Sequence, residues 1–186
     1  MVNSYKEVQE IALQKLSEFE QQHLDKDNAL DIVTFAEKQG FIVLEMPLSE
    51  SGLIIISDSL QENFKTKKLI IINERDFALR KRFTIAHELG HYFLRLQDEE
   101  LQGKHIALRN EKLNGIYKSQ EEKYADYFAS ILLMPGKKVL KLYEDRIDSG
   151  KSVRLYDMAT AMSKEFLVSK PAAVVRLRQL GMCENE

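Results

Sequence analysis

Apolar residues recur at helical spacing in the first part of the chain. Between residues 4 and 22 they are three or four positions apart, which predicts an amphipathic helix. The residues of this stripe are Tyr5, Val8, Ile11, Ala12, Leu16 and Phe19. A second helix is predicted over residues 29–39, where Asp27 or Asn28 can cap the first turn and Gly40 can end the last.

The pattern changes from Phe41 onward. Residues 41–44, 52–57 and 68–73 are short runs rich in β-branched side chains, separated by polar segments. Such runs are typical of strands, so we expect a small antiparallel or mixed sheet of three strands. The sheet directly precedes the next predicted helix.

Residues 82–94 form a segment that is apolar on nearly every side of a helix, which predicts burial. A polar stretch over residues 98–118 follows, and it is predicted to be a surface loop. Residues 120–134 again carry a helical apolar stripe, and Pro135 marks its end.

The last part of the chain is predicted to be helical. A charged helix over residues 137–147 is followed by a turn at residues 148–150. Residues 152–165 and a second helix ending at Gly181 then have the outline of a helix-turn-helix. The sequence therefore predicts an α+β protein in which a small three-stranded sheet packs on helices, with a C-terminal helical hairpin.

Composition bounds the class of protein. The 186 residues are 44% apolar, enough for one domain with a proper core. No segment is long and apolar enough to span a membrane, and the first residues lack the pattern of a signal peptide. Cys183 is the single cysteine, which excludes an internal disulfide, so we expect a cytoplasmic protein. Its 27 basic and 29 acidic residues leave a net charge of −2, without a general attraction for nucleic acid.

The buried helix carries the sequence His87-Glu88-x-x-His91, which contains two of the four histidines. At about 100° per residue, positions four apart share a helix face, so His87 and His91 can hold one metal ion together. Glu88 is rotated off that face, where a carboxylate can act as general base on a water activated by the metal. The alternative is two core histidines satisfied by backbone carbonyls, with Glu88 in solvent.

A catalytic zinc site of this kind needs a third protein ligand. Metzincins would have Gly at position 94 and His at position 97, whereas this chain has Leu94 and Gln97, which excludes that class. The downstream candidates are His105, Glu121, Glu122 and Asp126.

Glu122 and Asp126 lie one helical turn apart and face the same way. Glu122 can therefore bind the metal while Asp126 accepts the free ring N–H of a ligand histidine. Two alternatives remain open, because Glu121 could be the ligand and Ser119 with Glu122 also fits a capping box. His105 lies in a polar stretch and is more typical of a surface histidine.

Residues 83–91, 122–129 and 132–135 together resemble the ImmA/IrrE family of metallopeptidases, and the resemblance extends over residues 28–181. It implies a gluzincin-type zinc endopeptidase whose metal site is laid out like that of thermolysin. It also implies that His87, His91 and Glu122 are zinc ligands, that Glu88 is the general base and that Asp126 supports a ligand. We accordingly expect a zinc metallopeptidase-like domain with N-terminal helices over residues 1–150, on which residues 151–186 pack as a C-terminal hairpin.

The resemblance implies a narrow protein substrate, namely a helix-turn-helix transcriptional repressor that is cut to release a mobile element or a stress response. Manganese or iron could occupy the same ligands in place of zinc. In thermolysin-like enzymes an edge strand beside the metal binds the substrate backbone, and the same is expected here. Tyr92, Tyr124 and His105 are candidate donors to the developing oxyanion.

Two hypotheses from other classes compete with the peptidase. The C-terminal hairpin could read DNA, but Lys170, Arg176 and Arg178 are few basic residues for phosphate contacts, so direct DNA binding is not favoured. The chain could instead bind a repressor or antitoxin-like partner without cutting it. The sequence shows the capacity for hydrolysis and does not identify the substrate.

Overall fold

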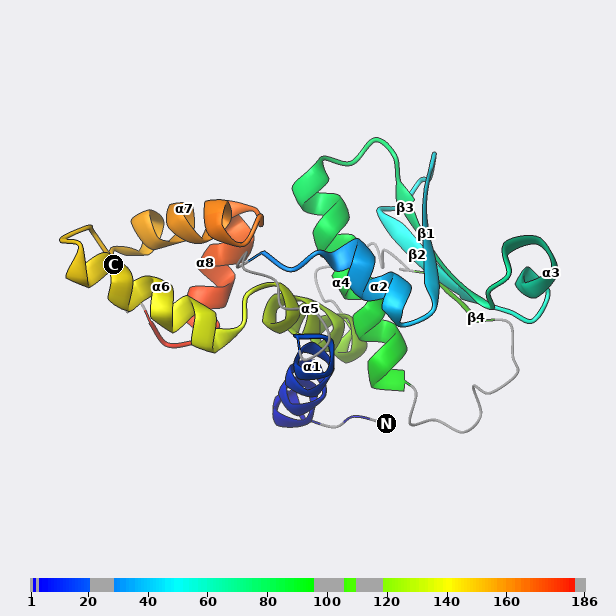
Figure 1. Cartoon of the computed structure of the whole chain (residues 1–186), viewed down its shortest axis with the longest axis horizontal. Coiled ribbons are helices and arrows are strands. Elements are labelled where there is room, and N and C mark those ends of the chain that lie inside the picture. Colours follow the sequence, from blue (N-terminus) through cyan, green and yellow to red (C-terminus); the bar gives the residue numbers. More distant parts are fainter. Residues whose placement is uncertain (1, 3, 21–28, 96–105, 110–118, 183–186) are drawn as a thin grey trace.

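The computed structural model describes residues 2, 4–20, 29–95, 106–109 and 119–182 (Figure 1). The described helices are α1 (Tyr5–Glu20), α2 (Ile32–Lys38), α3 (Leu60–Phe64), α4 (Ala78–Arg95), α5 (Gln120–Leu133), α6 (Gly136–Asp148), α7 (Leu155–Glu165) and α8 (Lys170–Gln179). The described strands are β1 (Phe41–Met46), β2 (Gly52–Ile56), β3 (Lys68–Asn73) and β4 (Ile106–Arg109). None of these helices combines the length and the apolar character that crossing a membrane requires.

The strands form one mixed sheet in the order β1-β3-β2-β4. β1 runs parallel to β3, with Phe41 opposite Lys68, and β2 runs antiparallel to both β3 and β4. The α+β class and the three predicted strands are thus confirmed. β4 is an addition, because it lies in the stretch that the sequence predicted to be a loop. A strand of four residues is too short for alternation to reveal it, and β4 forms by pairing with the second edge of β2.

Three local details of the segments around the first strands differ from the sequence prediction or complete it. The cap of α2 is Asp31, whose Oδ1 accepts hydrogen bonds from the amides of Val33 and Thr34, both at 3.2 Å. Asp27 and Asn28, the predicted caps, lie outside the described residues. Gly40 ends the helix with a φ of +84°, as its sequence position predicted. The five-residue α3 was not predicted, since it is shorter than two helical turns.

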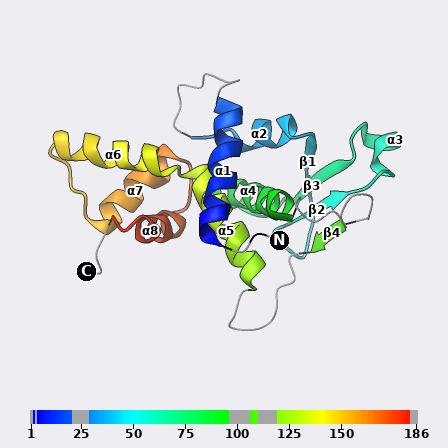
Figure 2. The same ribbon diagram turned by 90° about the horizontal axis from the view of Figure 1, so that it is seen from below.

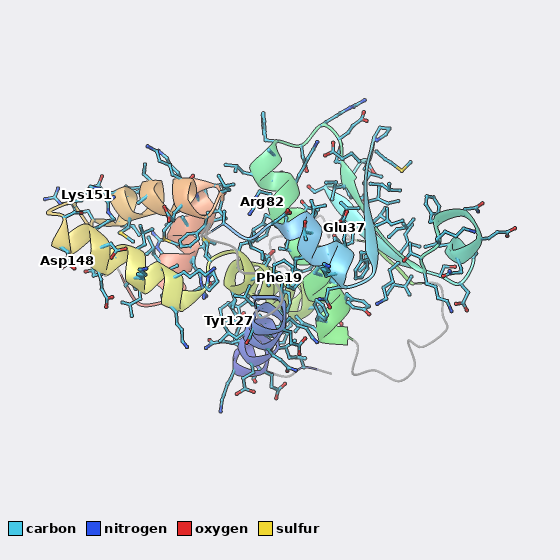
Figure 3. All side chains as sticks on the ribbon, viewed as in Figure 1. Phe19, Glu37, Arg82, Tyr127, Asp148 and Lys151 are labelled. Atoms are coloured by element: carbon cyan, nitrogen blue, oxygen red, sulfur yellow. The ribbon has the colours of Figure 1, made fainter. Side chains whose placement is uncertain are left out.

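The metal-motif helix α4 occupies the middle of the molecule. It contacts β2 and β3 on one side and α5 on another, while α1 packs against α5. Figure 2 shows α4 and α5 crossing beside α1, and the sheet beyond them. Tyr127 lies where α5 passes α1 (Figure 3), and its hydroxyl donates to Gln9 Oε1 at 3.2 Å. The helices α6, α7 and α8 gather at the opposite end from the sheet (Figure 1).

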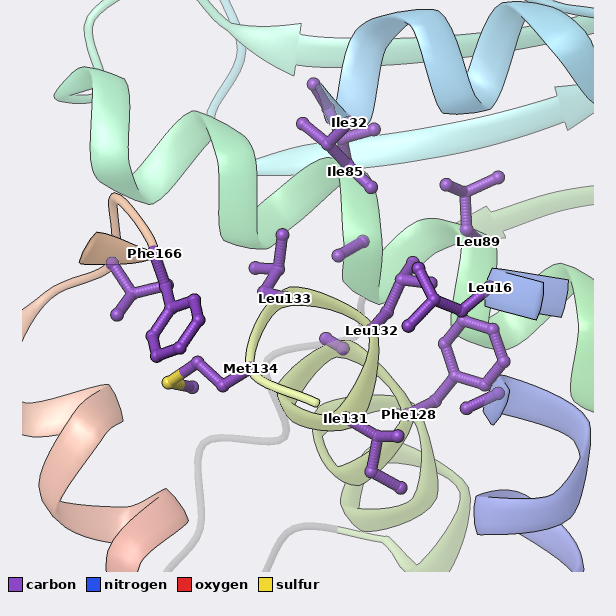
Figure 4. Packing of buried hydrophobic residues seen from close by; sticks show 14 of the residues in the cluster. Leu16, Ile32, Ile85, Leu89, Phe128, Ile131, Leu132, Leu133, Met134 and Phe166 are labelled. Carbon is purple, nitrogen blue, oxygen red and sulfur yellow. The ribbon is translucent and has the colours of Figure 1, made fainter. Parts of the chain in front are cut away.

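The hydrophobic core centres on α5. Its residues from Phe128 to Leu133 are all buried, and they meet side chains from the first helix, the metal-motif helix and the C-terminal hairpin (Figure 4). The buried core residues labelled in Figure 4 are Leu16, Ile32, Ile85, Leu89, Phe128, Ile131, Leu132, Leu133, Met134 and Phe166. At about 1.5–3 kcal/mol for each fully buried large side chain, this packing holds α5 firmly against α4.

The C-terminal helix α8 is joined to the end of α5 by a buried arginine. Arg176 is 4% exposed, and its Nε donates to the carbonyl of Met134 at 3.0 Å. Its Nη1 donates to Gln179 Oε1 at 3.3 Å, an oxygen that also accepts from Ser130 Oγ at 3.0 Å. The predicted helix pair therefore exists, but one of its basic residues faces the protein interior. The domain boundary at residue 150 stays a prediction.

We expect Arg176→Ala to lower the free energy of unfolding by about 2–4 kcal/mol, because it removes charged hydrogen bonds and leaves the Met134 carbonyl without this donor. The matched control is Arg178→Ala, which lies on the same helix and is exposed, and it should change stability by no more than about 0.5 kcal/mol. Urea unfolding followed by circular dichroism measures both. Equal effects of the two substitutions would contradict the structural role of Arg176.

Candidate metal centre

The two histidines of the motif lie on one face of α4, as their spacing predicted. Their Nε2 atoms are 3.0 Å apart, and the side chains are only 6% and 7% exposed for His87 and His91. Carboxylates of α5 contact the nitrogens of both rings, and the core-histidine alternative did not call for these contacts.

Glu122 extends toward these rings from the first turn of α5. Its carboxylate oxygens lie 3.3 Å from His87 Nε2 and 3.1 Å from His91 Nε2. Ser119 caps the helix by accepting a hydrogen bond from the amide of Glu122 at 3.2 Å. Half of the capping box is therefore present, because the serine caps α5 while the Glu122 carboxylate turns to the histidines. A capping role and a ligand position are compatible in this geometry.

Asp126 lies one turn further along α5 and contacts the other nitrogen of His87. Its Oδ1 is 3.0 Å from His87 Nδ1. A carboxylate can only accept in such a contact, so the Nδ1–H donates to it, and once the ring has lost its second proton the lone pair lies on Nε2. Asp126 therefore orients the ring and selects the tautomer that directs Nε2 toward His91 and Glu122.

The donor set fits a divalent metal ion. His87, His91 and Glu122 each offer a ligand atom, and these atoms all lie within 4.8 Å of one another. Two ligands of a tetrahedral zinc stand about 3.3 Å apart when each is about 2.0–2.1 Å from the metal, close to the 3.0–3.3 Å separations seen here. The side chain of Glu122 is 23% exposed. The cluster formed by His87, His91 and Glu122 is therefore open to solvent on the α5 side. Three such donors, with one side open, can hold a metal ion.

The charges of the cluster shift the pKa values of its members. Burial lowers the pKa of His87, but the Asp126 and Glu122 carboxylates outweigh it and raise that pKa to about 10. Burial tends to raise the pKa of Glu122, but its hydrogen bonds with both histidines bring that pKa well below the usual range. A bound cation would take the place of the proton that these contacts favour.

Glu88 is fully buried on a different side of α4 from the two histidines. Burial raises the pKa of its carboxyl, and this effect exceeds the opposing attraction of His87, so the pKa is about 7. The structure thus places Glu88 in the interior next to the cluster, not in solvent as the core-histidine alternative assumed.

A glycine that the sequence analysis overlooked lets α4 and α5 approach each other. A Cβ on Gly90 would lie 3.1 Å from both the Cα and the carbonyl oxygen of Ala125, and 3.3 Å from Phe128 Cβ. Glycine inside an apolar helix costs about 1 kcal/mol relative to alanine, so such a position usually has a packing reason. The presence of this unfavourable residue inside the helix is the sequence feature that could have predicted the close contact.

The remaining candidates are placed elsewhere or lie outside the described residues. Glu121 is exposed on the first turn of α5. The hydroxyl of Tyr92 accepts a hydrogen bond from Lys68 Nζ at 2.6 Å, and the ring of Tyr124 packs edge-on against Tyr5. Neither of these two contacts involves His87, His91 or Glu122. His105 lies outside the described residues.

Comparison with known proteins agrees with this geometry. The model of a peptidase family, described as the IrrE N-terminal-like domain, matches residues 36–178. No curated protein matches the sequence. The matched region contains all of α4 and α5, and therefore every side chain of the cluster.

Paired alanine substitutions separate the two neighbouring glutamates. We expect Glu122→Ala to weaken zinc binding by at least about tenfold, because it removes one of three donors, whereas Glu121→Ala should leave it unchanged. Zinc content by atomic emission and competition with a chromogenic chelator measure both variants. The opposite ranking would show that Glu121 is the ligand.

Proposed function

The chain belongs to the IrrE N-terminal-like domain family, a family of peptidases, and we propose that it is a zinc-dependent endopeptidase. The observation that carries the proposal is the convergence of His87, His91 and Glu122 from two helices, with the buried carboxylate of Glu88 beside them. A structural histidine pair needs neither the third donor nor a second buried acid.

His87, His91 and Glu122 are the residues that would hold the zinc, with Asp126 fixing the ring of His87. Zinc held there supplies Lewis acidity, which makes water a stronger acid and polarises a peptide carbonyl. Imidazole and carboxylate donors also accept manganese or iron, so the preference for zinc is part of the proposal.

Glu88 has the role of general base. Its carboxylate takes a proton from the water that attacks the scissile carbonyl carbon, so that a new C–O bond forms. When the C–N bond breaks, Glu88 returns that proton to the leaving amine nitrogen. The position of Glu88 on α4, adjacent in sequence to His87 but off the ligand face, lets it serve the reacting water without binding the metal.

The substrate that we propose is a cytoplasmic helix-turn-helix transcriptional repressor, which is what the resemblance to the ImmA/IrrE family implies. The burial of Arg176 supports a protein partner over DNA, since it removes one of the three basic residues that a DNA-reading hairpin would use.

We expect Glu88→Gln to retain one zinc per chain but to lose cleavage by about a hundredfold or more, because the amide cannot accept the proton. His87→Ala should lose both zinc and cleavage. The assay incubates each purified variant with a helix-turn-helix repressor encoded near its gene and follows fragments by mass spectrometry. Binding of that repressor without cleavage by the wild-type, zinc-loaded protein would favour a binding module over a peptidase.

The sheet offers one edge near Glu88. β2 is the strand whose first residue, Gly52, lies beside Glu88, and β4 pairs with β2 so that Arg109 is opposite Leu53. β1 forms the other edge, but β3 separates it from β2. Among the described strands β4 has no neighbour on its outer side. We therefore propose that an extended substrate adds to this edge and pairs with the main chain of β4.

This assignment predicts a local change in amide hydrogen exchange. With a saturating substrate peptide and the Glu88→Gln variant, alternate amides within residues 106–109 should become protected, because only every second amide of a strand faces its outer edge. The amides of β1 should not change. Protection of β1 in place of β4 would contradict the choice of edge.

A further inference from the structure

One face of α4 meets the beginning of β2 over three successive turns. Arg80, Thr84 and Glu88 are four residues apart and share this face. All three approach the same two residues, Ser51 and Gly52. The general base is therefore the last member of a row that is packed against one short segment of backbone.

Gly52 has no room for a side chain. A Cβ there would lie 2.4 Å from Thr84 Cγ2 and 3.1 Å from the carbonyl oxygen of Ile71. Thr84 is only 6% exposed, and a β-branched side chain on a helix has few rotamers to which it can move. The absence of a side chain at position 52 is thus what allows β2 to lie directly on α4.

The same backbone lies beside the carboxylate of Glu88. Glu88 Oε1 is 3.7 Å from the position of that Cβ, an ordinary van der Waals distance, and Glu88 is fully buried. A side chain at position 52 would consequently lie in contact with the Glu88 carboxylate as well as overlap Thr84. With glycine at position 52, the space beside the buried carboxylate stays free of a second side chain.

Hydrogen bonds hold this segment of backbone in place. Arg80 donates to Ser51 Oγ from Nη2 at 2.6 Å and from Nε at 3.1 Å. The side chain of Asn73 donates to the carbonyls of Leu48 and Glu50 at 2.8 and 3.0 Å. The backbone amide of Asn73 donates to the Ser51 carbonyl at 2.8 Å. The turn before β2 is therefore fixed to both the end of β3 and the first turn of α4.

We propose that Gly52 is a positioning residue for the general base, and that Ser51 keeps it in position. The proposal rests on the peptidase function, since it concerns how Glu88 is held for proton transfer. A displacement of about 1 Å in a reacting group can cost up to about a hundredfold in rate. A side chain at position 52 would produce such a displacement by pushing Thr84 and the turn of α4 that bears Glu88.

The test uses Gly52→Ala and the double variant Gly52→Ala/Thr84→Ser. Serine keeps the hydroxyl of Thr84 but lacks Cγ2, the atom that the new Cβ would strike. The matched control is Gly136→Ala, on the first residue of α6, where a Cβ would meet the end of the Leu180 side chain at 3.3 Å and Arg176 Nη2 at the ordinary distance of 4.0 Å. Zinc content, kcat, KM and the unfolding midpoint of the zinc-free protein are measured for each.

We expect Gly52→Ala to reduce kcat by about 10- to 100-fold, with KM and zinc content as in wild type. The overlap with Thr84 should also lower the unfolding midpoint of Gly52→Ala. Adding Thr84→Ser should restore most of the lost kcat and bring the unfolding midpoint back toward the wild-type value. Gly136→Ala should match wild type in all four measurements. This combination separates positioning of the base from loss of the metal.

Wild-type kcat in Gly52→Ala overturns the proposal, and so does a loss of kcat that is fully accounted for by loss of zinc. If Gly52→Ala does not fold, Ser51→Ala replaces it, because it removes the bond to Arg80 and leaves Gly52 intact. A reduced kcat at unchanged KM and zinc content then supports the positioning role, and an unchanged kcat overturns it. Absence of zinc-dependent cleavage in wild type defeats the peptidase function itself, whereas cleavage by wild type and Gly52→Ala alike defeats only the positioning role.

Discussion

The close approach of α4 and α5 is the constraint on which the rest of the structure depends. Gly90 and Ala125 bring the two backbones together, since a Cβ on Gly90 would lie 3.1 Å from the Ala125 backbone. This contact places the face that carries His87 and His91 opposite the first turns of α5, which carry Glu122 and Asp126. The cost of about 1 kcal/mol for glycine inside a helix is small beside the core packing that surrounds it.

The polar cluster is tolerated in this helix interface because its members satisfy one another. Isolated buried histidines and carboxylates would be costly, but here Asp126 accepts from His87, and Glu122 contacts both rings. Ser119 contributes indirectly. By capping α5 with its own hydroxyl, it leaves the carboxylate of Glu122 available for the histidines. The N-terminus of α5 therefore combines helix capping with the geometry of a candidate metal site, and the Ser119 cap does not compete with a ligand role for Glu122.

Periodicity and spacing predicted much of this fold. The helices α1, α4, α5 and α7 and the strands β1, β2 and β3 follow from apolar patterns, and the histidine pair follows from a spacing of four residues on a helix. Strand order and β4 could not be predicted, because pairing between distant strands leaves no local signal. The contacts of Gly52 and Gly90 were missed for a related reason, since a missing side chain shows its purpose only when the opposing backbone is known.

The C-terminal hairpin shows why an outline of helices does not define a function. Its two late arginines suggested phosphate contacts, yet Arg176 is buried and donates to the carbonyl that ends α5. A positive charge at a helix C-terminus interacts favourably with the helix dipole, so Arg176 stabilises α5 electrostatically as well as by hydrogen bonding. Because α5 also carries Glu122 and Asp126 at its other end, α8 supports the candidate metal site through a shared rigid helix. The hairpin thus contributes to the site by fixing α5, and this role requires no contact with substrate or nucleic acid.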